Sequence, residues 1–248
     1  MRSPNVNKRK NMKRASSNYS IKILSTIILM LISIAGFSTS AFTKDLKSKN
    51  DEKQFERYIP SQHKLFELLK GDLNKDGIPD IVLITKKVDP KNWAIHQGSG
   101  EKVDRNRRGI IVLINRNGKY QKLTQNLSAF SSENEDGGVY YAPDLMTEIH
   151  NNFLLISYLH GRYGNWGYKF RIENNDMRLI GYDSYSNRGP IQETHTSINF
   201  MTNKKLFKDN LNKSDEELAP KYKEKWSKVD FKPIYLSKIV DFDDLHFN

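Results

Sequence analysis

Short apolar runs separated by turn residues constrain the fold of this 248-residue chain more than any other feature. Residues 81–84 (IVLI) and 110–114 (IIVLI) are apolar at every position and rich in β-branched side chains. Runs this short, with this composition, are typical of strands that are buried on both faces. Each run therefore predicts a strand in the middle of a sheet.

Asparagine-rich turns join further candidate strands into hairpins. The Asn-Gly pair at 117–118 stands between IIVLI and KYQKL, and both residue types tolerate the positive φ of a tight hairpin turn. The Asn pair at 151–152 separates LMTEIH from FLLISYLH, and Asn-Asn-Asp at 174–176 separates YKFRIE from MRLIGYD. Three successive hairpins describe an antiparallel meander. We expect one mainly β domain over residues 57–248, built as a meander, a sandwich or a partial-propeller-like sheet.

Helix is expected in only two short places. Residues 51–57 form one candidate. Residues 215–226 form the other, because Ser214 and Glu217 have the spacing of a capping box. Pro220 lies inside this second segment and would disturb it.

The first 41 residues predict a secretory signal peptide. Residues 1–41 hold seven basic residues and no acidic one, and residues 23–37 (ILSTIILMLISIAGF) form an uncharged run of 15. A basic start, a short apolar run and small residues before a cleavage site define such a peptide. We expect cleavage after Ser40 or Ala41. An uncleaved anchor is less favoured because the run is short for a membrane span. Residues 42–56 would then form a flexible N-terminal segment.

Charge and cysteine content narrow the class of protein. The formal charge is +11, but much of that excess belongs to the leader, so the remaining chain is close to charge balance and nucleic-acid binding is not expected. The absence of Cys excludes disulfides, a lipid-modified cysteine and a cysteine nucleophile. We expect a periplasmic or secreted protein with no stable membrane span after cleavage.

Residues 71–80 (GDLNKDGIPD) contain the one motif with recognisable chemistry. Alternate positions of a tight loop point inward, and Gly77 allows the chain to reverse. The candidate ligands are three carboxylates, one amide oxygen and one backbone carbonyl: Asp72, Asn74, Asp76, Asp80 and the carbonyl of Ile78. Hard oxygen ligands at this spacing suit Ca²⁺, with Mg²⁺ as the alternative. Because residues 81–84 lead directly into the core, we expect the ion to be structural.

This loop resembles the calcium hairpin of integrin-type FG-GAP and VCBS repeats. In those repeats a D-x-[DN]-x-D-G-x-x-D loop joins two strands, and here FELL at 66–69 and IVLI at 81–84 flank the loop. The resemblance implies a calcium-binding role for the five candidate ligands. An EF-hand is excluded because an EF-hand loop needs Glu at its twelfth position, and counting from Asp72 that position is Leu83 here. A full propeller is not expected, since each blade would repeat a motif that occurs once here.

A broader resemblance covers residues 58–183. The chain is similar there to a group of exported, largely uncharacterised bacterial proteins. The shared order is YIP at 58–60, the GDLNKDG loop, NGKY at 117–120, GG at 137–138 and HGRYGNWGYKF at 160–170. This resemblance implies a periplasmic or secreted location and no particular reaction.

Two further segments are candidate binding surfaces. The SSENEDGG segment carries Glu133, Glu135 and Asp136, which could hold a second ion or act as paired carboxylates, although a solvated loop is the simpler interpretation. A glycine-rich segment carries the side chains of a candidate interaction surface: Tyr158, His160, Arg162, Tyr163, Trp166 and Tyr168. Aromatic and Arg side chains dominate interface hot spots. Aromatic packing over a glycine-rich hairpin would give the same pattern.

No enzyme signature accompanies the calcium motif. The nucleophile motif G-x-S-x-G is absent, and so are histidine pairs with zinc-site spacing. We therefore expect a non-enzymatic calcium-binding protein whose partner is a protein or an envelope polymer. A periplasmic immunity protein and an envelope-interaction protein are specific forms of this hypothesis. The alternatives are a calcium-dependent hydrolase of an envelope polymer, using the acidic segment near the ion, and a self-associating surface component.

Overall fold

The computed structural model describes residues 53–136, 141–215 and 217–247. The chain divides into two compact units, Met1–Lys47 and Ser48–Asn248, and every described element belongs to the second. The predicted signal peptide, most of the flexible segment and the Gly pair at 137–138 lie outside the described residues. Within the described ranges, no helix has the length and apolar character needed to cross a membrane.

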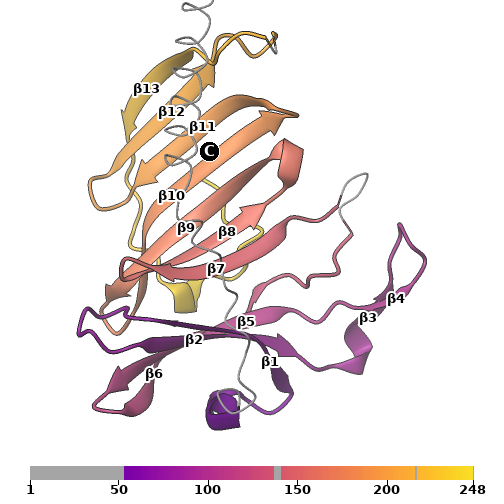
Figure 1. The fold of residues 1–248 in the computed structure, drawn as a ribbon, viewed down its shortest axis with the longest axis vertical. Coiled ribbons are helices and arrows are strands. Elements are labelled where there is room, and N and C mark those ends of the chain that lie inside the picture. The colour runs from indigo at the N-terminus through magenta and orange to yellow at the C-terminus, as the bar shows by residue number, and fades with distance from the viewer. Residues whose placement is uncertain (1–52, 137–140, 216, 248) are drawn as a thin grey trace, which may run out of the picture. The chain divides into compact units, whose positions relative to one another are not determined.

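A four-stranded antiparallel sheet has the strand order β1-β2-β5-β6 (Figure 1). Its strands are β1 (His63–Gly71), β2 (Asp80–Lys87), β5 (Arg108–Arg116) and β6 (Lys119–Phe130). β2 and β5 are the central pair, and nearly all of their residues are buried. The prediction of central strands at 81–84 and 110–114 is confirmed.

A seven-stranded antiparallel sheet forms the second layer, with its strands in sequence order from β7 at one edge to β13 at the other. The strands are β7 (Asp144–His150), β8 (Phe153–Leu159), β9 (Gly164–Glu173), β10 (Asp176–Arg188), β11 (Ile191–Asn199), β12 (Lys204–Asn210) and β13 (Tyr222–Lys228). This sheet is a simple meander. The mainly β fold predicted from the sequence is therefore confirmed.

The predicted turns close hairpins in both sheets. Positive φ angles occur at Asn117, Asn151, Asn152, Asn174 and Asn175. The turn at 117–118 joins β5 to β6, whereas the other two join β7 to β8 and β9 to β10. The three hairpins thus do not form one continuous meander, because the first belongs to the four-stranded sheet.

Two clusters of apolar side chains occupy the two faces of the four-stranded sheet. The larger lies between the sheets and joins Val82 and Ile84 of β2 to Leu154 and Ile156 of β8. The smaller lies on the opposite face and joins Ile81 and Leu83 to Phe55 of the N-terminal helical turn. Successive side chains of β2 point alternately into the two clusters. Both faces of the strand are therefore buried, which explains why residues 81–84 are apolar at every position.

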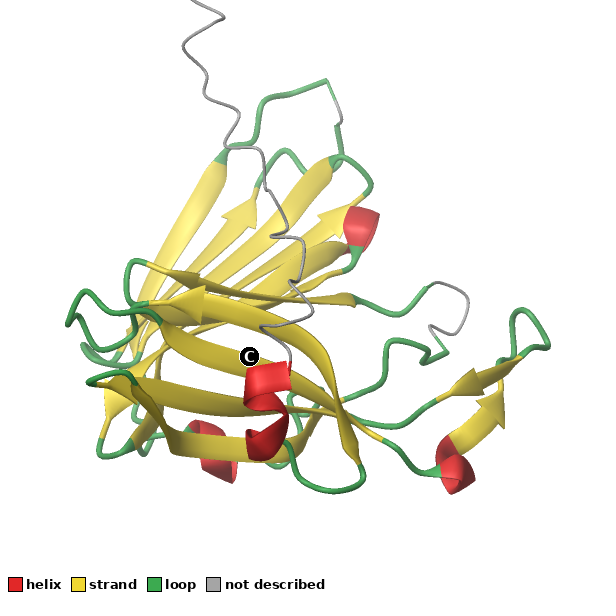
Figure 2. Cartoon of the chain, turned by 60° about the horizontal axis from the view of Figure 1, so that its bottom comes forward, coloured by secondary structure: helices red, strands yellow, loops and turns green. Residues whose placement is uncertain are grey.

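Helical structure is sparse, as Figure 2 shows. Residues 53–55 are helical and continue into η1 (Glu56–Tyr58), which agrees with the first predicted helix over the part that is described. The other short helices are η2 (Pro90–Asn92), η3 (Gly161–Tyr163) and η4 (Leu236–Lys238). A separate hairpin of β3 (Trp93–Ile95) and β4 (Lys102–Asp104) lies to the side of both sheets (Figure 1).

The second predicted helix, at 215–226, is wrong. Residues 222–228 instead form β13, which pairs along its whole length with β12, from Tyr222 opposite Asn210 to Lys228 opposite Lys204. Pro220 prevents a helix from continuing through this segment. Residues 222–228 instead form their backbone hydrogen bonds with the open edge of β12.

Candidate functional site

The loop with the calcium-type motif connects β1 to β2 at the tip of a hairpin. Gly71 and Asp80 are paired residues at the base of this hairpin. Lys75 and Gly77 have φ angles of 68° and 78°, so the backbone reverses twice within a few residues. The loop from Asn74 to Pro79 is exposed to solvent.

Three of the predicted ligands have side chains that are held by hydrogen bonds within this loop, in two separate sets. The carboxylate of Asp72 accepts the amides of Lys75 at 2.6 Å and Gly77 at 3.0 Å. The side chain of Asn74 donates to Asp76 at 2.9 Å and accepts the amide of Asp76 at 3.0 Å. The loop therefore holds two carboxylates and one amide group through its own backbone.

Asp80 occupies a different environment at the base of the loop. Its side chain is fully buried and accepts the amides of Leu73 at 2.8 Å and Asn115 at 2.9 Å. Burial raises the pKa of the Asp80 carboxyl, and the charge of Asp76 acts in the same direction, while the amides of Asn115 and Leu73 oppose the rise. Asp80 thus fastens the loop to the end of β5.

The donor atoms of the loop fit a hard cation in their chemistry. Asp72, Asn74 and Asp76 offer oxygen atoms on one short, exposed segment, and a carboxylate oxygen that accepts one amide keeps a second lone pair. Across the described ranges, no three His, Cys, Asp or Glu side chains are gathered as they would be around a metal ion. We attribute this to Asp80, which turns toward the sheet. Asp72, Asn74 and Asp76 are accordingly the residues that would hold Ca²⁺.

A neighbouring pocket of about 410 Å³ adjoins the loop. Asn152, in the turn between β7 and β8, donates to the carbonyl of Asp72 at 2.8 Å. The pocket is lined by Leu73, Asn74, Lys75, Asn152, Phe153, Arg171 and Ile172. The sequence alone does not place Asn152, Phe153, Arg171 and Ile172 beside the loop, because they meet it only when the two sheets pack together.

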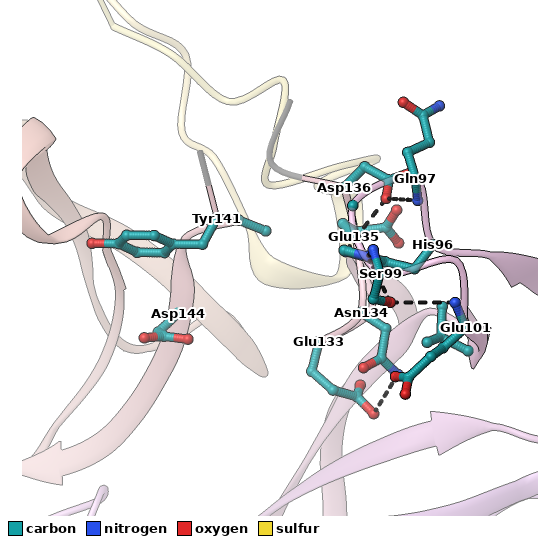
Figure 3. A pocket seen from close by; sticks show the side chains of 13 residues that line it. His96, Gln97, Ser99, Glu101, Glu133, Asn134, Glu135, Asp136, Tyr141 and Asp144 are labelled. Atoms are coloured by element: carbon teal, nitrogen blue, oxygen red, sulfur yellow. Dashed lines mark hydrogen bonds and ion pairs between the residues drawn. The ribbon is translucent and has the colours of Figure 1, made fainter. Parts of the chain in front are cut away.

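The acidic segment at 133–136 borders a different and larger pocket of about 580 Å³ (Figure 3). The Glu133 carboxylate contacts the buried ammonium of Lys86 at 2.5 Å, and Asp136 forms an ion pair with Arg105. Figure 3 shows Glu135 and Asp136 beside His96 of the β3–β4 hairpin and Glu133 farther from it, with Tyr141 and Asp144 across an opening.

The two acidic regions lie at opposite ends of β2. Lys86, which contacts Glu133, is six residues from Asp80, and six residues of strand span about 20 Å. The described arrangement therefore does not bring Glu133, Glu135 or Asp136 beside the loop at 72–80. Their charges are instead matched by Lys86 and Arg105, and His96 lies 3.4 Å from Asp136.

The predicted interaction surface at 158–168 requires correction. Tyr158 and Tyr168 are each 2% exposed and belong to the cluster between the sheets, and Trp166 packs against that cluster. The ring of Trp166 stacks on that of Tyr158 with centroids 5.3 Å apart. These three rings therefore contribute to the core. Of the predicted set, Arg162 is exposed and His160, Tyr163 and Trp166 are partly exposed. Trp166 also lines a pocket of about 280 Å³.

The structure thus distributes the predicted residues over four places: the loop with its buried base, the acidic pocket, the core between the sheets and the surface around η3. No family model, curated protein or solved structure matches this chain.

Proposed function

We propose that this protein is an exported calcium-binding β domain that acts by binding another macromolecule and not by catalysis. The observation that supports this proposal most is the exposed hairpin loop that carries Asp72, Asn74 and Asp76, whose side-chain oxygens are held by hydrogen bonds within the loop. The predicted signal peptide supports export. A periplasmic immunity protein and an envelope-interaction protein are the forms of this function that we favour.

Charge within the loop gives calcium binding a physical reason. Asp76 contributes to the raised pKa of the buried Asp80, so the carboxylates of this loop repel one another when no cation is present. A divalent cation would remove that repulsion. A site with a Kd of about 0.1 mM would stabilise the fold by about 1.4 kcal/mol at 1 mM Ca²⁺.

Thermal unfolding of the mature chain in EDTA and in 1 mM Ca²⁺ tests this proposal. We expect Ca²⁺ to raise the Tm by about 3–5 °C, given the size of the domain. Asp76→Ala should abolish the shift. Asp230→Ala, which changes an exposed aspartate outside the loop, should retain it. An equal shift in the Asp76→Ala variant, or none in the wild type, would contradict the proposal.

The hydrolase alternative receives no support from the described arrangement. It placed Glu133, Glu135 or Asp136 near the ion, whereas these residues contact cations at the other end of β2. A binding function requires only an accessible surface beside the loop, and the pocket of about 410 Å³ supplies one.

A further inference from the structure

We infer that the pocket beside the loop binds a short acidic saccharide, with Ca²⁺ in the loop as a requirement. This inference rests on the proposed calcium function and extends it to a ligand class. The pocket has a volume of about 410 Å³, which falls within the usual range for small-molecule sites. Its walls come from the loop, from the turn between β7 and β8, and from β9.

A hydrogen bond fixes the loop and the sheet to each other at this pocket. Asn152 donates to the Asp72 carbonyl at 2.8 Å, and Asn152 has a positive φ of 64° that the hairpin turn requires. Asn74 is both a candidate ion ligand and a lining residue of the pocket. An ion in the loop would therefore lie at the rim of the pocket.

Basic side chains around the pocket favour an anionic ligand. Lys75 is exposed at its edge. Arg171 donates to Glu173 at 2.6 Å, and Arg178 forms an ion pair with the same carboxylate, so two guanidinium groups share one negative charge. Lys169 lies 5.0 Å from the centre of the Phe153 ring and adds another cation nearby.

Calcium dependence follows from the opposing charges in the loop. Asp72 and Asp76 would repel an anion at the rim of the pocket as long as their charges are not neutralised. A bound Ca²⁺ would cancel these two negative charges. The positive charges of Lys75 and of the Arg171–Arg178 group would then dominate the electrostatic potential in the pocket. An anionic ligand would therefore bind after the ion.

The remaining lining residues favour a sugar over a simple inorganic anion. Leu73, Phe153 and Ile172 give the pocket an apolar surface, while Asn74 and Asn152 give it amide groups. A sugar ring has C–H faces that pack on apolar side chains and hydroxyls that bond to amides. A carboxylate on the ring would pair with Lys75 or Arg171. These features together indicate an acidic saccharide such as a uronate.

Calorimetric titration of the mature protein with trigalacturonate tests the inference directly. A trimer is used because long polyuronates gel with Ca²⁺, and galactotriose is the matched neutral probe. In 1 mM Ca²⁺ we expect submillimolar binding of trigalacturonate. In EDTA, and for galactotriose in Ca²⁺, affinity should be at least tenfold weaker.

Two variants separate this inference from the calcium proposal. Lys75→Gln should weaken trigalacturonate binding at least fivefold and should not weaken Ca²⁺ binding, because it removes a positive charge from beside the candidate ligands. Lys122→Gln, an exposed lysine of β6, should change neither.

Each other result has a defined meaning. Normal Ca²⁺ binding without trigalacturonate binding would overturn only the saccharide inference, whereas absence of Ca²⁺ binding would overturn the proposed function as well. Trigalacturonate binding that is unaffected by EDTA, or equally strong in Lys75→Gln, would also contradict the inference. A protein partner that depends on Lys75, without saccharide binding, would assign the pocket to a protein instead.

Discussion

Asp80 shows how a single side chain positions the loop relative to the fold. Its two oxygen atoms accept amides from Leu73, within the loop, and from Asn115, at the end of β5. Both bonds are buried, and bonds from buried amides to a charged acceptor are among the stronger ones in proteins. Asp80 therefore ties the hairpin tip to the central strands whether or not the loop carries an ion.

The raised pKa of Asp80 leads to a prediction about pH. The pKa of the folded state exceeds the ordinary value of 3.8, so above that value the folded state binds more protons than the unfolded state. Stability contributed by Asp80 must then fall as pH rises through the interval between the two pKa values. Urea unfolding of the wild type and Asp80→Asn between pH 3.5 and 6 should show the wild type losing stability relative to the variant. A relative gain with rising pH would show that the pKa is lowered instead.

At the level of elements, the pairing of β5 with β6 depends on close backbone contact at Gly109. The register of this pair shifts between Arg108 and Ile110, which marks a bulge. A Cβ atom added at Gly109 would lie within 3.0 Å of backbone atoms of Leu127 in β6. Only a glycine allows the two strands to approach this closely.

Gly109→Ala should therefore destabilise the protein strongly. We expect a loss of about 3 kcal/mol or more in the free energy of unfolding, because backbone must move to relieve the contact. Gly181→Ala is the matched control within a strand: its added Cβ would lie 3.5 Å from the Cβ of Lys169, an ordinary contact. Urea unfolding at neutral pH should show a change below about 1 kcal/mol for this control. Equal losses in both variants would contradict the argument.

Local signals and distant contacts were not equally predictable from the sequence. The turns at 117–118, 151–152 and 174–176 were predictable because positive φ favours Asn and Gly locally. The assignment of each hairpin to its sheet was not, since it depends on side chains far apart in the chain. β13 was missed for the same reason: its sequence is polar, and the edge of β12 determines its conformation.

The candidate site likewise has a part that the local sequence predicts and a part that depends on tertiary packing. The candidate ligands of the loop are predictable from their spacing alone, whereas Asn152 and Arg171 come beside the loop only through packing of the two sheets. For Tyr158 and Tyr168 the sequence leaves open a surface role and aromatic packing, because glycine-rich aromatic segments can face either way. Alternation along β8 and β9 turns these rings inward, against Phe242 and the rest of the core.

At the scale of the whole molecule, the last segment of the described chain completes the core between the sheets. Leu236, Ile239, Phe242 and Phe247 are all buried there. Phe242 contacts the rings of Phe130 in β6 and Tyr168 in β9, with centroids 4.9 Å and 5.1 Å away. Its amide donates to the carbonyl of Ala129 at 3.0 Å, so one residue links both sheets.

Truncation of the Phe242 side chain should weaken the packing between the two sheets. Phe242→Ala is expected to lower the free energy of unfolding by about 3–5 kcal/mol, because it removes a buried ring and leaves a cavity. Val240→Ala, two residues away and 88% exposed, should change it by less than about 0.5 kcal/mol. Chemical unfolding of both variants provides the comparison. A loss below about 1 kcal/mol for Phe242→Ala would show that the segment does not contribute to the core.

The position of this segment along the chain also orders the events of folding. The hairpins of both sheets are synthesised before residues 236–247, yet the space between the sheets is not filled until these residues arrive. Until they pack, a folding intermediate would expose an aromatic surface around Phe130 and Tyr168. Such an intermediate would be incompletely packed and prone to aggregation until this last described segment docks between the sheets.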